Sequence, residues 1–290
     1  MQHFACSEIV RLLCKQAVST PTGSISAPNL RGVPQGLSIS GALSALYMLR
    51  FDRLQLSRNP NYFRYVDDIL LICSTKTADD CLKAISRSLS SRGLIAHKKG
   101  VVGKTEMMPV SEGVDFLGYR ICVDKVSIRK SSYRRMFKNL LKVMTDYRYR
   151  KNNDRLIFRL NLKITGCVVD GRRRGWMMFF SHTEDVSQLA YLDTFIAQQL
   201  ARVNFPPNQI GNIKRFIKSY HEIRFNLDSS RYIPNLNNFE RSDKVIAIVA
   251  LSNKSPEEVS AWDDQHVDQE FSRLMSREVH DLEADVGNPS

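Results

Sequence analysis

The sequence predicts an α+β chain, with short antiparallel strands covered by helices in its first part and a mostly helical second part. Two runs of strand-forming residues flank an Asp-Asp pair near residue 67 and indicate a hairpin. Apolar residues recur at helical spacing over residues 76–92, which predicts a helix that covers the sheet. After Lys130 the apolar pattern becomes helical and stays so.

The paired acids, Asp67 and Asp68, lie between residues 62–66 and 69–73, which are rich in strand-forming types. We expect a buried hairpin with Val66, Asp67 and Asp68 at or beside its turn. Buried carboxylates are costly unless a positive charge neutralises them, and Mg²⁺ takes carboxylate oxygens while leaving positions for water and phosphate. The alternative is ordinary turn chemistry, because Asp is frequent in β-turns.

The stretch LRGVPQGLSIS at residues 30–40 predicts a loop that leads into an apolar helix over residues 41–51. Its glycines and proline restrict the loop, and Gln35 supplies a donor and an acceptor. Gly36 permits close approach of the backbone to a ligand. Taken alone, this stretch is also typical of a loop that only starts a helix.

Together these stretches resemble the palm of reverse transcriptases. RGVPQGLSIS is similar to the motif that contacts template and incoming nucleotide, and the YVDD of residues 65–68 is similar to the metal-binding hairpin. Residues 93–95 with 104–105 look like the fourth palm motif, and FLGYRI at residues 116–121 looks like the primer-grip hairpin. The motifs follow one another in the family's order.

The resemblance implies RNA-directed DNA polymerisation in which carboxylates hold two Mg²⁺ ions, one at the primer 3′ hydroxyl and one at the triphosphate. Asp67 matches the family's second metal-binding aspartate, and Asp68 matches its neighbour. The implied partners are an RNA template, a DNA primer and product, and deoxynucleoside triphosphates (dNTPs). The other implied site residues are Gln35 and Gly36 beside nucleotide and template, Lys104 beside the leaving pyrophosphate, and Phe116, Leu117 and Gly118 as the primer grip. For Lys104, a solvated surface lysine is the alternative.

One departure from the family concerns its first metal-binding aspartate, which would fall before Met1, as would the fingers segment. Residues 1–50 contain a single acid, Glu8, within a helical pattern. We therefore expect an incomplete active site that leaves this chain inactive on its own. The intact motifs favour a truncated chain; the alternatives are a partner that supplies the missing half, or a chain that no longer catalyses.

Charge is unevenly distributed along the chain. The net charge is +12, but residues 255–290 hold ten acidic and two basic residues, a net −8, which leaves +20 for residues 1–254. A basic body of this kind attracts polyphosphate through counterion release, although a solvated basic surface is the alternative.

Two basic stretches are candidates for contact with a nucleic-acid backbone. In residues 132–151 an apolar face predicts core packing; its members are Tyr133, Phe137, Leu140, Leu141, Met144 and Tyr147. Arg134, Arg135 and Lys138 lie largely elsewhere, as in a helical thumb that holds duplex product. In CVVDGRRRGWMMFFSH at residues 167–182, a tight turn at Asp170-Gly171 precedes three arginines that are expected to grip phosphates, Arg172, Arg173 and Arg174. Trp176 is either a core residue or a base-stacking platform.

The remaining elements are expected to be helical. Residues 1–29 predict a helix and then a flexible polar loop from residue 19. Thr183 is expected to cap a helix that runs to residue 203, and residues 210–225 form a further helix. Ser255 starts an acidic helix that either folds back on the basic body or docks a partner.

The resemblance divides the chain into a partial palm at residues 1–123, a helical thumb at 124–241 and an acidic helical extension at 242–290. LNLKITGC, DGRRRGWMMFFS and YIPNLNNF look similar to bacterial defence-associated reverse transcriptases of the unknown-group type, with retron and group II intron enzymes as near relatives. This finer resemblance implies antiviral defence, a structured non-coding RNA as template or scaffold, and a second reverse transcriptase subunit as a candidate partner.

Two other classes of function stay open, a non-catalytic RNA-binding subunit of a reverse transcriptase complex and a helical RNA-binding module in which YVDD is accidental. No apolar run has the length of a membrane span, and residues 1–14 lack the pattern of a secretory signal. We therefore expect no membrane partner and a bacterial cytoplasmic location. The six cysteines show no C-x-x-C spacing, so we expect reduced thiols rather than zinc or disulfides.

Overall fold

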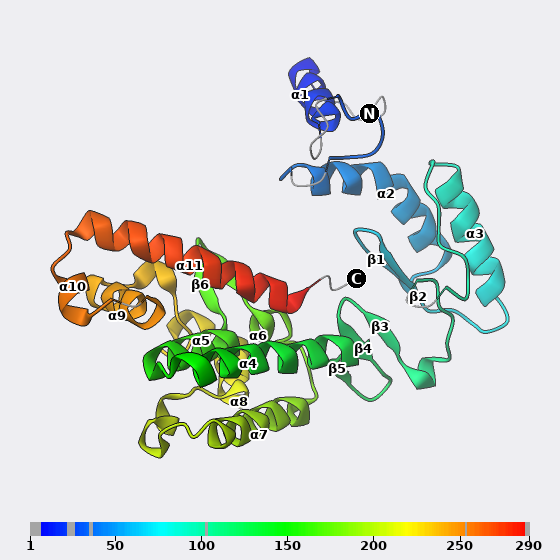
Figure 1. The fold of residues 1–290 in the computed structure, drawn as a ribbon. Helices are drawn as coiled ribbons and strands as arrows, with labels where there is room; N and C mark the ends of the chain where they lie inside the picture. The colour runs from blue at the N-terminus through cyan, green and yellow to red at the C-terminus, as the bar shows by residue number, and fades with distance from the viewer. Residues whose placement is uncertain (1–6, 22–26, 35–36, 102–103, 253, 288–290) are drawn as a thin grey trace. The chain divides into compact units, whose positions relative to one another are not determined.

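The computed structural model describes residues 7–21, 27–34, 37–101, 104–252 and 254–287 (Figure 1). The chain divides into two units, Met1–Val110 and Ser111–Ser290, each with its own core. Helices alternate with small antiparallel sheets, which confirms the α+β prediction. The division differs from the predicted boundaries at residues 123 and 241, and the functional domains stay a prediction.

The first unit places one β-hairpin against helices. Its core joins Met48 and Phe51 of α2, Tyr62 of β1, and Ile85 and Leu89 of α3. Since these residues lie on one face of the hairpin, helices cover that face (Figure 1). The elements of this unit are α1 (Glu8–Ser19), α2 (Ser40–Arg58), β1 (Tyr62–Tyr65), β2 (Asp68–Leu71) and α3 (Ala78–Ser90).

The second unit is mostly helical, with two small sheets. A short 3₁₀ helix, η1 (Val110–Glu112), lies at its start. Its strands are β3 (Val114–Phe116), β4 (Tyr119–Ile121), β5 (Val126–Ile128), β6 (Cys167–Val169) and β7 (Arg172–Arg174). Its α-helices are α4 (Lys130–Arg150), α5 (Asn153–Thr165), α6 (Trp176–Phe179), α7 (Val186–Arg202), α8 (Phe216–Phe225), α9 (Arg241–Leu251), α10 (Pro256–Ser260) and α11 (Asp264–Val286). Further 3₁₀ helices are η2 (Pro207–Asn212), η3 (Leu227–Ser229) and η4 (Leu236–Asn238).

The main core of this unit is formed mainly by residues of the five helices from α4 through α8. Trp176, Phe180 and Phe216 are fully buried in it, together with Leu160 of α5. The assignment of Trp176 to the core is therefore confirmed, and the stacking alternative is wrong. Buried Trp and Phe side chains supply large apolar areas, which stabilises this core.

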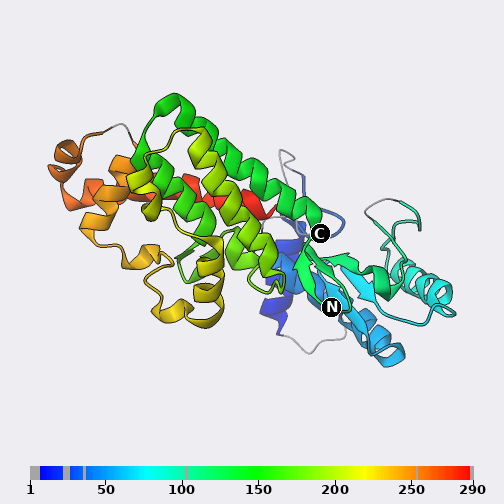
Figure 2. The ribbon, with the colours of Figure 1, turned by 90° about the horizontal axis from the view of Figure 1, so that it is seen from below.

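The apolar face predicted for α4 is correct except at one position. Leu141 is 40% exposed, because it is turned about 100° around the helix from the buried Leu140. α4 and α7 lie side by side (Figure 1, Figure 2), and the hydroxyl of Tyr133 donates to the Gln188 carbonyl at 2.8 Å. The other predicted face residues are buried or half-buried: Tyr133, Phe137, Leu140, Met144 and Tyr147.

Two predicted helix starts are wrong for tertiary reasons. Thr183 is buried and does not cap α7, which begins at Val186. The helix predicted over residues 210–225 is interrupted, since α8 begins only at Phe216. There the carboxylate of Asp193, on α7, accepts the backbone N–H of Phe216 at 2.7 Å and of Ile217 at 3.3 Å. Burial raises the pKa of Asp193, although these bonds oppose the shift.

The acidic C-terminal helix folds back on the basic body, which confirms the first of the two predicted alternatives. Ser255 caps α10 as expected, accepting the N–H of Glu258 at 3.2 Å. α11 then packs along α9, and its Val267, Phe271 and Leu282 join a core with Leu162 of α5 (Figure 1).

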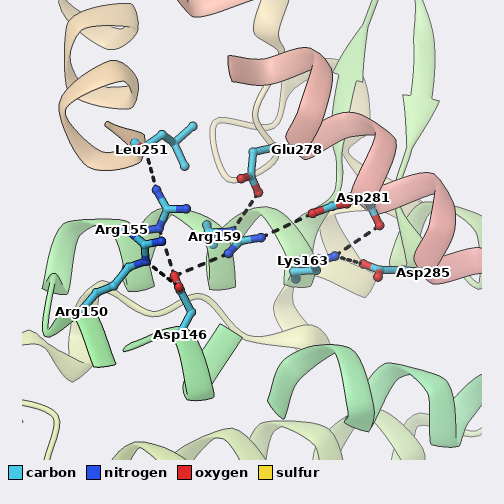
Figure 3. Close-up of polar contacts among 9 residues, drawn as sticks. All are labelled: Asp146, Arg150, Arg155, Arg159, Lys163, Leu251, Glu278, Asp281 and Asp285. Carbon is cyan, nitrogen blue, oxygen red and sulfur yellow. Dashed lines mark hydrogen bonds and ion pairs between the residues drawn. The ribbon is translucent and has the colours of Figure 1, made fainter. Parts of the chain in front are cut away.

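Ion pairs between α5 and α11 accompany this packing (Figure 3). Arg159 Nε lies 3.1 Å from Glu278 Oε2, and its Nη2 lies 3.4 Å from Asp281 Oδ2. Lys163 Nζ donates to Asp285 Oδ2 at 2.6 Å, and both side chains are at least 93% buried. Burial raises the pKa of Asp285, and the opposing attraction of Lys163 does not cancel this effect.

The described cysteines are free, with Cys14 and Cys167 buried and Cys73, Cys81 and Cys122 half-buried. In the described part of the chain, no helix is both long enough and apolar enough to cross a membrane.

Replacing Leu160 by Ala is expected to lower the free energy of unfolding by about 2–5 kcal/mol, because it removes buried methyl groups and leaves a cavity. Leu141→Ala, at an exposed site on the neighbouring helix, is the control and should change it by about 0.5 kcal/mol or less. Urea denaturation followed by circular dichroism measures both. Equal effects would contradict the described core.

Lys163→Met is expected to lower the free energy of unfolding by about 3–5 kcal/mol, because Asp285 stays buried without its cation. The double variant Lys163→Met with Asp285→Leu should recover most of this loss, since it buries no unpaired charge. Lys244→Met removes a more exposed pair with Asp268 and should cost about 1 kcal/mol or less. A double variant no more stable than Lys163→Met would contradict the explanation that the loss comes from the unpaired, buried Asp285.

Candidate active site and nucleic-acid interface

The hairpin of β1 and β2 closes with a two-residue turn. Tyr65 pairs with Asp68, which leaves Val66 and Asp67 as the turn residues, so the predicted hairpin and its turn are confirmed. Val66 adopts a positive φ of 52°. This conformation is unusual for a β-branched residue and is strained, because its Cβ crowds the backbone.

The turn is exposed, which corrects the expectation that it is buried. Asp67 is exposed and Asp68 is half-buried. The reason is that Tyr62, Ile69 and Leu71 pack on the helices, whereas the turn lies beyond these core residues. The sequence pattern could not distinguish the two cases, because apolar residues flank the acids on both sides.

The donor chemistry of this turn suits a hard cation. Mg²⁺ is commonly bound by one or two carboxylates together with substrate phosphates and water. Within the residues that the structure describes, no group of three or more His, Cys, Asp or Glu side chains is placed to hold a metal. Two adjacent carboxylates are compatible with an ion that also takes ligands from a bound phosphate, and metal binding at Asp67 and Asp68 stays a prediction.

An ion-pair cluster that the sequence analysis did not predict lies at the base of the turn. Arg64 Nε donates to Asp52 Oδ1 at 2.7 Å, and its Nη2 donates to Asp52 Oδ2 at 2.6 Å. The hydroxyl of Tyr62 donates to Asp52 Oδ1 at 2.8 Å. Two sequence signals were available. Asp52 is the single acid of α2, and Tyr62 and Arg64 are two residues apart on β1, which places them on the same face of the strand.

Electrostatics within this cluster favours the charged forms of Asp52 and Arg64. Burial opposes the charge of Asp52, but the hydrogen bonds of Arg64 and Tyr62 outweigh it and hold the pKa of Asp52 below its usual value. The hydrogen bond to Asp52 raises the pKa of Arg64. Burial, followed by the bond to Asp52, raises the pKa of Tyr62. The cluster is therefore a fixed ion pair at neutral pH.

The loop at residues 30–40 lies beside the segment predicted as the fourth palm motif. Arg31 Nη2 donates to the Gly93 carbonyl at 3.4 Å, and the hydroxyl of Tyr47 donates to the Arg92 carbonyl. Two of the predicted motifs are therefore neighbours in the first unit. Gln35 and Gly36, the predicted nucleotide and template contacts, lie outside the described residues.

Lys104 is exposed in the loop between α3 and η1. The hydrogen bonds of this loop are local. The hydroxyl of Thr105 donates to the His97 carbonyl at 2.7 Å, and the backbones of Lys99 and Thr105 form an isolated parallel β-bridge. These bonds do not join Lys104 to the Asp67 turn, and its role at the pyrophosphate stays a prediction.

The predicted primer-grip residues form the turn between β3 and β4. Leu117 and Gly118 both have positive φ, 50° and 81°, and Phe116 pairs with Tyr119 across the turn. A Cβ at Gly118 would lie 3.2 Å from the Phe180 ring, so glycine permits close packing on α6. The hydroxyl of Tyr119 donates to the Phe179 carbonyl at 2.7 Å. This hairpin is therefore anchored within the second unit.

α4 presents an exposed basic face, whose members Lys130, Arg134, Lys138 and Arg148 recur at helical spacing. The first three are four residues apart, which is about 6 Å along the helix axis. Arg135 points elsewhere and donates to the Val286 carbonyl at 2.9 Å. Of the predicted α4 contacts, Arg134 and Lys138 are thus the two on the basic face.

The predicted arginine turn is a hairpin of β6 and β7 closed by Asp170 and Gly171, both at positive φ. Arg172 and Arg173 are exposed beside the turn. Arg174 is half-buried and pairs with Glu283 of α11. Only the first two guanidinium groups of this run are exposed.

The three stretches LNLKITGC, DGRRRGWMMFFS and YIPNLNNF come together around this hairpin. Val168 N–H donates to the Pro234 carbonyl at 2.9 Å. Asp170 N–H donates to Asn237 Oδ1 at 3.1 Å. Leu162, Cys167 and Leu236 share one core. Segments far apart in the sequence therefore form one continuous substructure.

Comparison with known proteins adds an independent observation. The family model described as reverse transcriptase (RNA-dependent DNA polymerase) matches residues 1–121. No curated protein matches this chain. The match spans the residues 30–40 loop, the Asp67 turn and the β3–β4 hairpin. Residues 1–121 therefore match a reverse transcriptase domain.

Proposed function

We propose that this chain is an RNA-directed DNA polymerase that acts in bacterial antiviral defence. The observation that carries the proposal is the exposed two-residue turn that presents Asp67 next to Asp68, within residues that match a reverse transcriptase domain. The partial palm extends over residues 1–123, and the helical thumb and acidic extension follow it. The function is nucleotidyl transfer from dNTPs to a DNA primer on an RNA template.

In this proposal Asp67 and Asp68 hold Mg²⁺ together with phosphate oxygens. Bound metal would supply Lewis-acid chemistry there, making the attacking hydroxyl more acidic and neutralising charge on the triphosphate. Gln35 and Gly36 border nucleotide and template, and Lys104 lies at the pyrophosphate. The β3–β4 turn, Phe116 to Gly118, supports the primer end.

Backbone contacts are assigned to the basic face of α4 and to the arginine hairpin. The exposed members are Arg134, Lys138, Arg172 and Arg173. Their charges can pair with phosphates without displacing another partner. Such contacts hold a nucleic acid without reading its sequence, which suits a polymerase that must move along its template.

The defence role rests on the sequence resemblance of the three stretches that form the substructure around β6 and β7. Its three segments pack on one another through backbone hydrogen bonds and a shared core. We assign this substructure to a bacterial system in which a structured non-coding RNA serves as template or scaffold and a second reverse transcriptase subunit takes part.

A second candidate is a non-catalytic RNA-binding subunit. Two observations favour it: the described residues supply two adjacent turn carboxylates but no larger metal-binding group, and the basic face of α4 needs no catalysis to bind RNA. Catalysis and binding are therefore measured separately below.

Asp67→Asn is expected to reduce primer extension on an RNA template by about a hundredfold or more, because it removes a carboxylate that would hold Mg²⁺ beside the reacting phosphates. Asp79→Asn is the matched control: Asp79 is exposed on α3 and pairs with Lys99 at 2.8 Å. Incorporation of dNTPs with Mg²⁺ by the protein from its natural gene is the measurement. Equal extension by the two variants would overturn the role of Asp67, and no extension by the unchanged protein would favour the non-catalytic subunit.

The logarithm of the RNA-binding constant K is expected to fall linearly with the logarithm of the salt concentration. The variant Arg134→Gln with Lys138→Gln should reduce the slope by about 2, one for each lost phosphate contact. Arg273→Gln is the control, because Arg273 lies on the acidic α11 and pairs with Glu270. Fluorescence anisotropy at several salt concentrations measures the slope. An unchanged slope in the double variant would remove α4 from the interface.

A further inference from the structure

Arg64 joins the turn that carries Asp67 to helix α2. Its Nε and Nη2 grip both carboxylate oxygens of Asp52, at 2.7 and 2.6 Å, and its Nη1 donates to the Val66 carbonyl at 2.6 Å. The Arg64 side chain is only 10% exposed and that of Asp52 21%. A guanidinium presents its N–H groups in a rigid fork, so the pair with Asp52 determines where Nη1 points.

The atom that Nη1 contacts is one rigid unit away from Asp67. The peptide group between Val66 and Asp67 is planar, and it includes the Val66 carbonyl oxygen and the Asp67 Cα. Holding that oxygen therefore restrains the peptide plane and, with it, the position of the Asp67 Cα. The residue that carries the oxygen is itself strained, since Val66 has a φ of 52°.

Strain of this kind persists only where surrounding contacts impose it. The other described hairpin turns, Leu117-Gly118 and Asp170-Gly171, also have a residue other than glycine at positive φ in the first position, but neither Leu117 nor Asp170 is β-branched, and glycine follows each. The Val66-Asp67 turn has no glycine. Its positive φ falls on a β-branched residue, the least favourable of the three cases, and the bond from Arg64 to the Val66 carbonyl is an external contact that favours it.

We infer that Arg64 is a positioning residue that, held by Asp52, imposes the strained Val66 conformation and so aims the Asp67 carboxylate. This inference rests on the proposed function for its use of Asp67, but the geometry that it concerns is measurable without catalysis. It also couples α2, which follows the predicted template loop, to the turn.

A merely stabilising ion pair is the competing explanation. Arg64→Lys distinguishes these two explanations. Lysine keeps the charge and one bond to Asp52, but it lacks the guanidinium fork that also holds the Val66 carbonyl. If Arg64 only stabilises the unit, the lysine variant should behave like the unchanged protein, or loosen the whole unit. If it positions the turn, the change should be confined to the hairpin.

Hydrogen–deuterium exchange on the full chain tests this directly. In Arg64→Lys, amides of residues 62–71 are expected to exchange about tenfold faster, the effect of losing one hydrogen bond to a charged group, while those of α3 do not change. Arg53→Lys, at an exposed position of α2, is the matched control and should leave both segments unchanged. Unchanged exchange in the hairpin, or equal acceleration in α3, would overturn the inference.

A second variant tests the strain itself. Glycine at position 66 adopts positive φ without strain, so the turn in Val66→Gly no longer needs Arg64. Adding Arg64→Lys to Val66→Gly is therefore expected to accelerate hairpin exchange much less than it does in the unchanged background. Equal acceleration in both backgrounds would contradict the assigned role.

Primer extension separates this inference from the proposed function. Arg64→Lys is expected to raise the Mg²⁺ concentration for half-maximal extension while the KM for primer stays unchanged, since Asp67 is misdirected but the nucleic-acid surface is intact. If Asp67→Asn extends normally, the proposed function fails whatever the exchange shows. If Asp67→Asn is inactive but Arg64→Lys matches Arg53→Lys in exchange and Mg²⁺ dependence, the positioning role fails and the proposed function stands.

Discussion

Charge complementarity between α11 and the helices beneath it determines which cations of the second unit can meet another molecule. The buried pair of Lys163 and Asp285 lies at its centre, with Arg159 shared between Glu278 and Asp281 (Figure 3). A buried carboxylate is tolerated only beside a cation, so α11 and α5 cannot separate without a large loss of free energy. The acidic helix is therefore part of the core rather than an appended tail.

This constraint sorts the basic residues into two sets. Arg135 and Arg174 are held by the C-terminal helix, through a backbone carbonyl and through Glu283. Arg134, Lys138, Arg172 and Arg173 are left exposed. Because a nucleic acid must compete with existing acceptors for the first set, a carbonyl at Arg135 and a carboxylate at Arg174, the exposed set is the better account of a phosphate-binding surface.

The hairpins obey a second constraint, the need for positive φ in two-residue turns. At Leu117-Gly118 and Asp170-Gly171 glycine takes one of the two positive-φ positions, and a residue without a branched Cβ takes the other. At Val66-Asp67 the residue types oppose the conformation, and a contact from Arg64, fixed on Asp52, acts against them. Strain of this kind is typical of functional sites, and here it lies next to the carboxylates that the proposed chemistry uses.

The sequence alone determined the features that depend on neighbouring residues: the hairpin turns at residues 66–67 and 170–171, and the cap at Ser255. The motif order also indicated the reverse transcriptase domain that the family comparison matches over residues 1–121. Only the tertiary structure decided the exposure of Asp67, the capping of α8 by Asp193 and the contact of Arg64 with Asp52. The physical reason is that burial and ion pairing join residues distant in sequence, and no local pattern encodes which acid a given arginine meets.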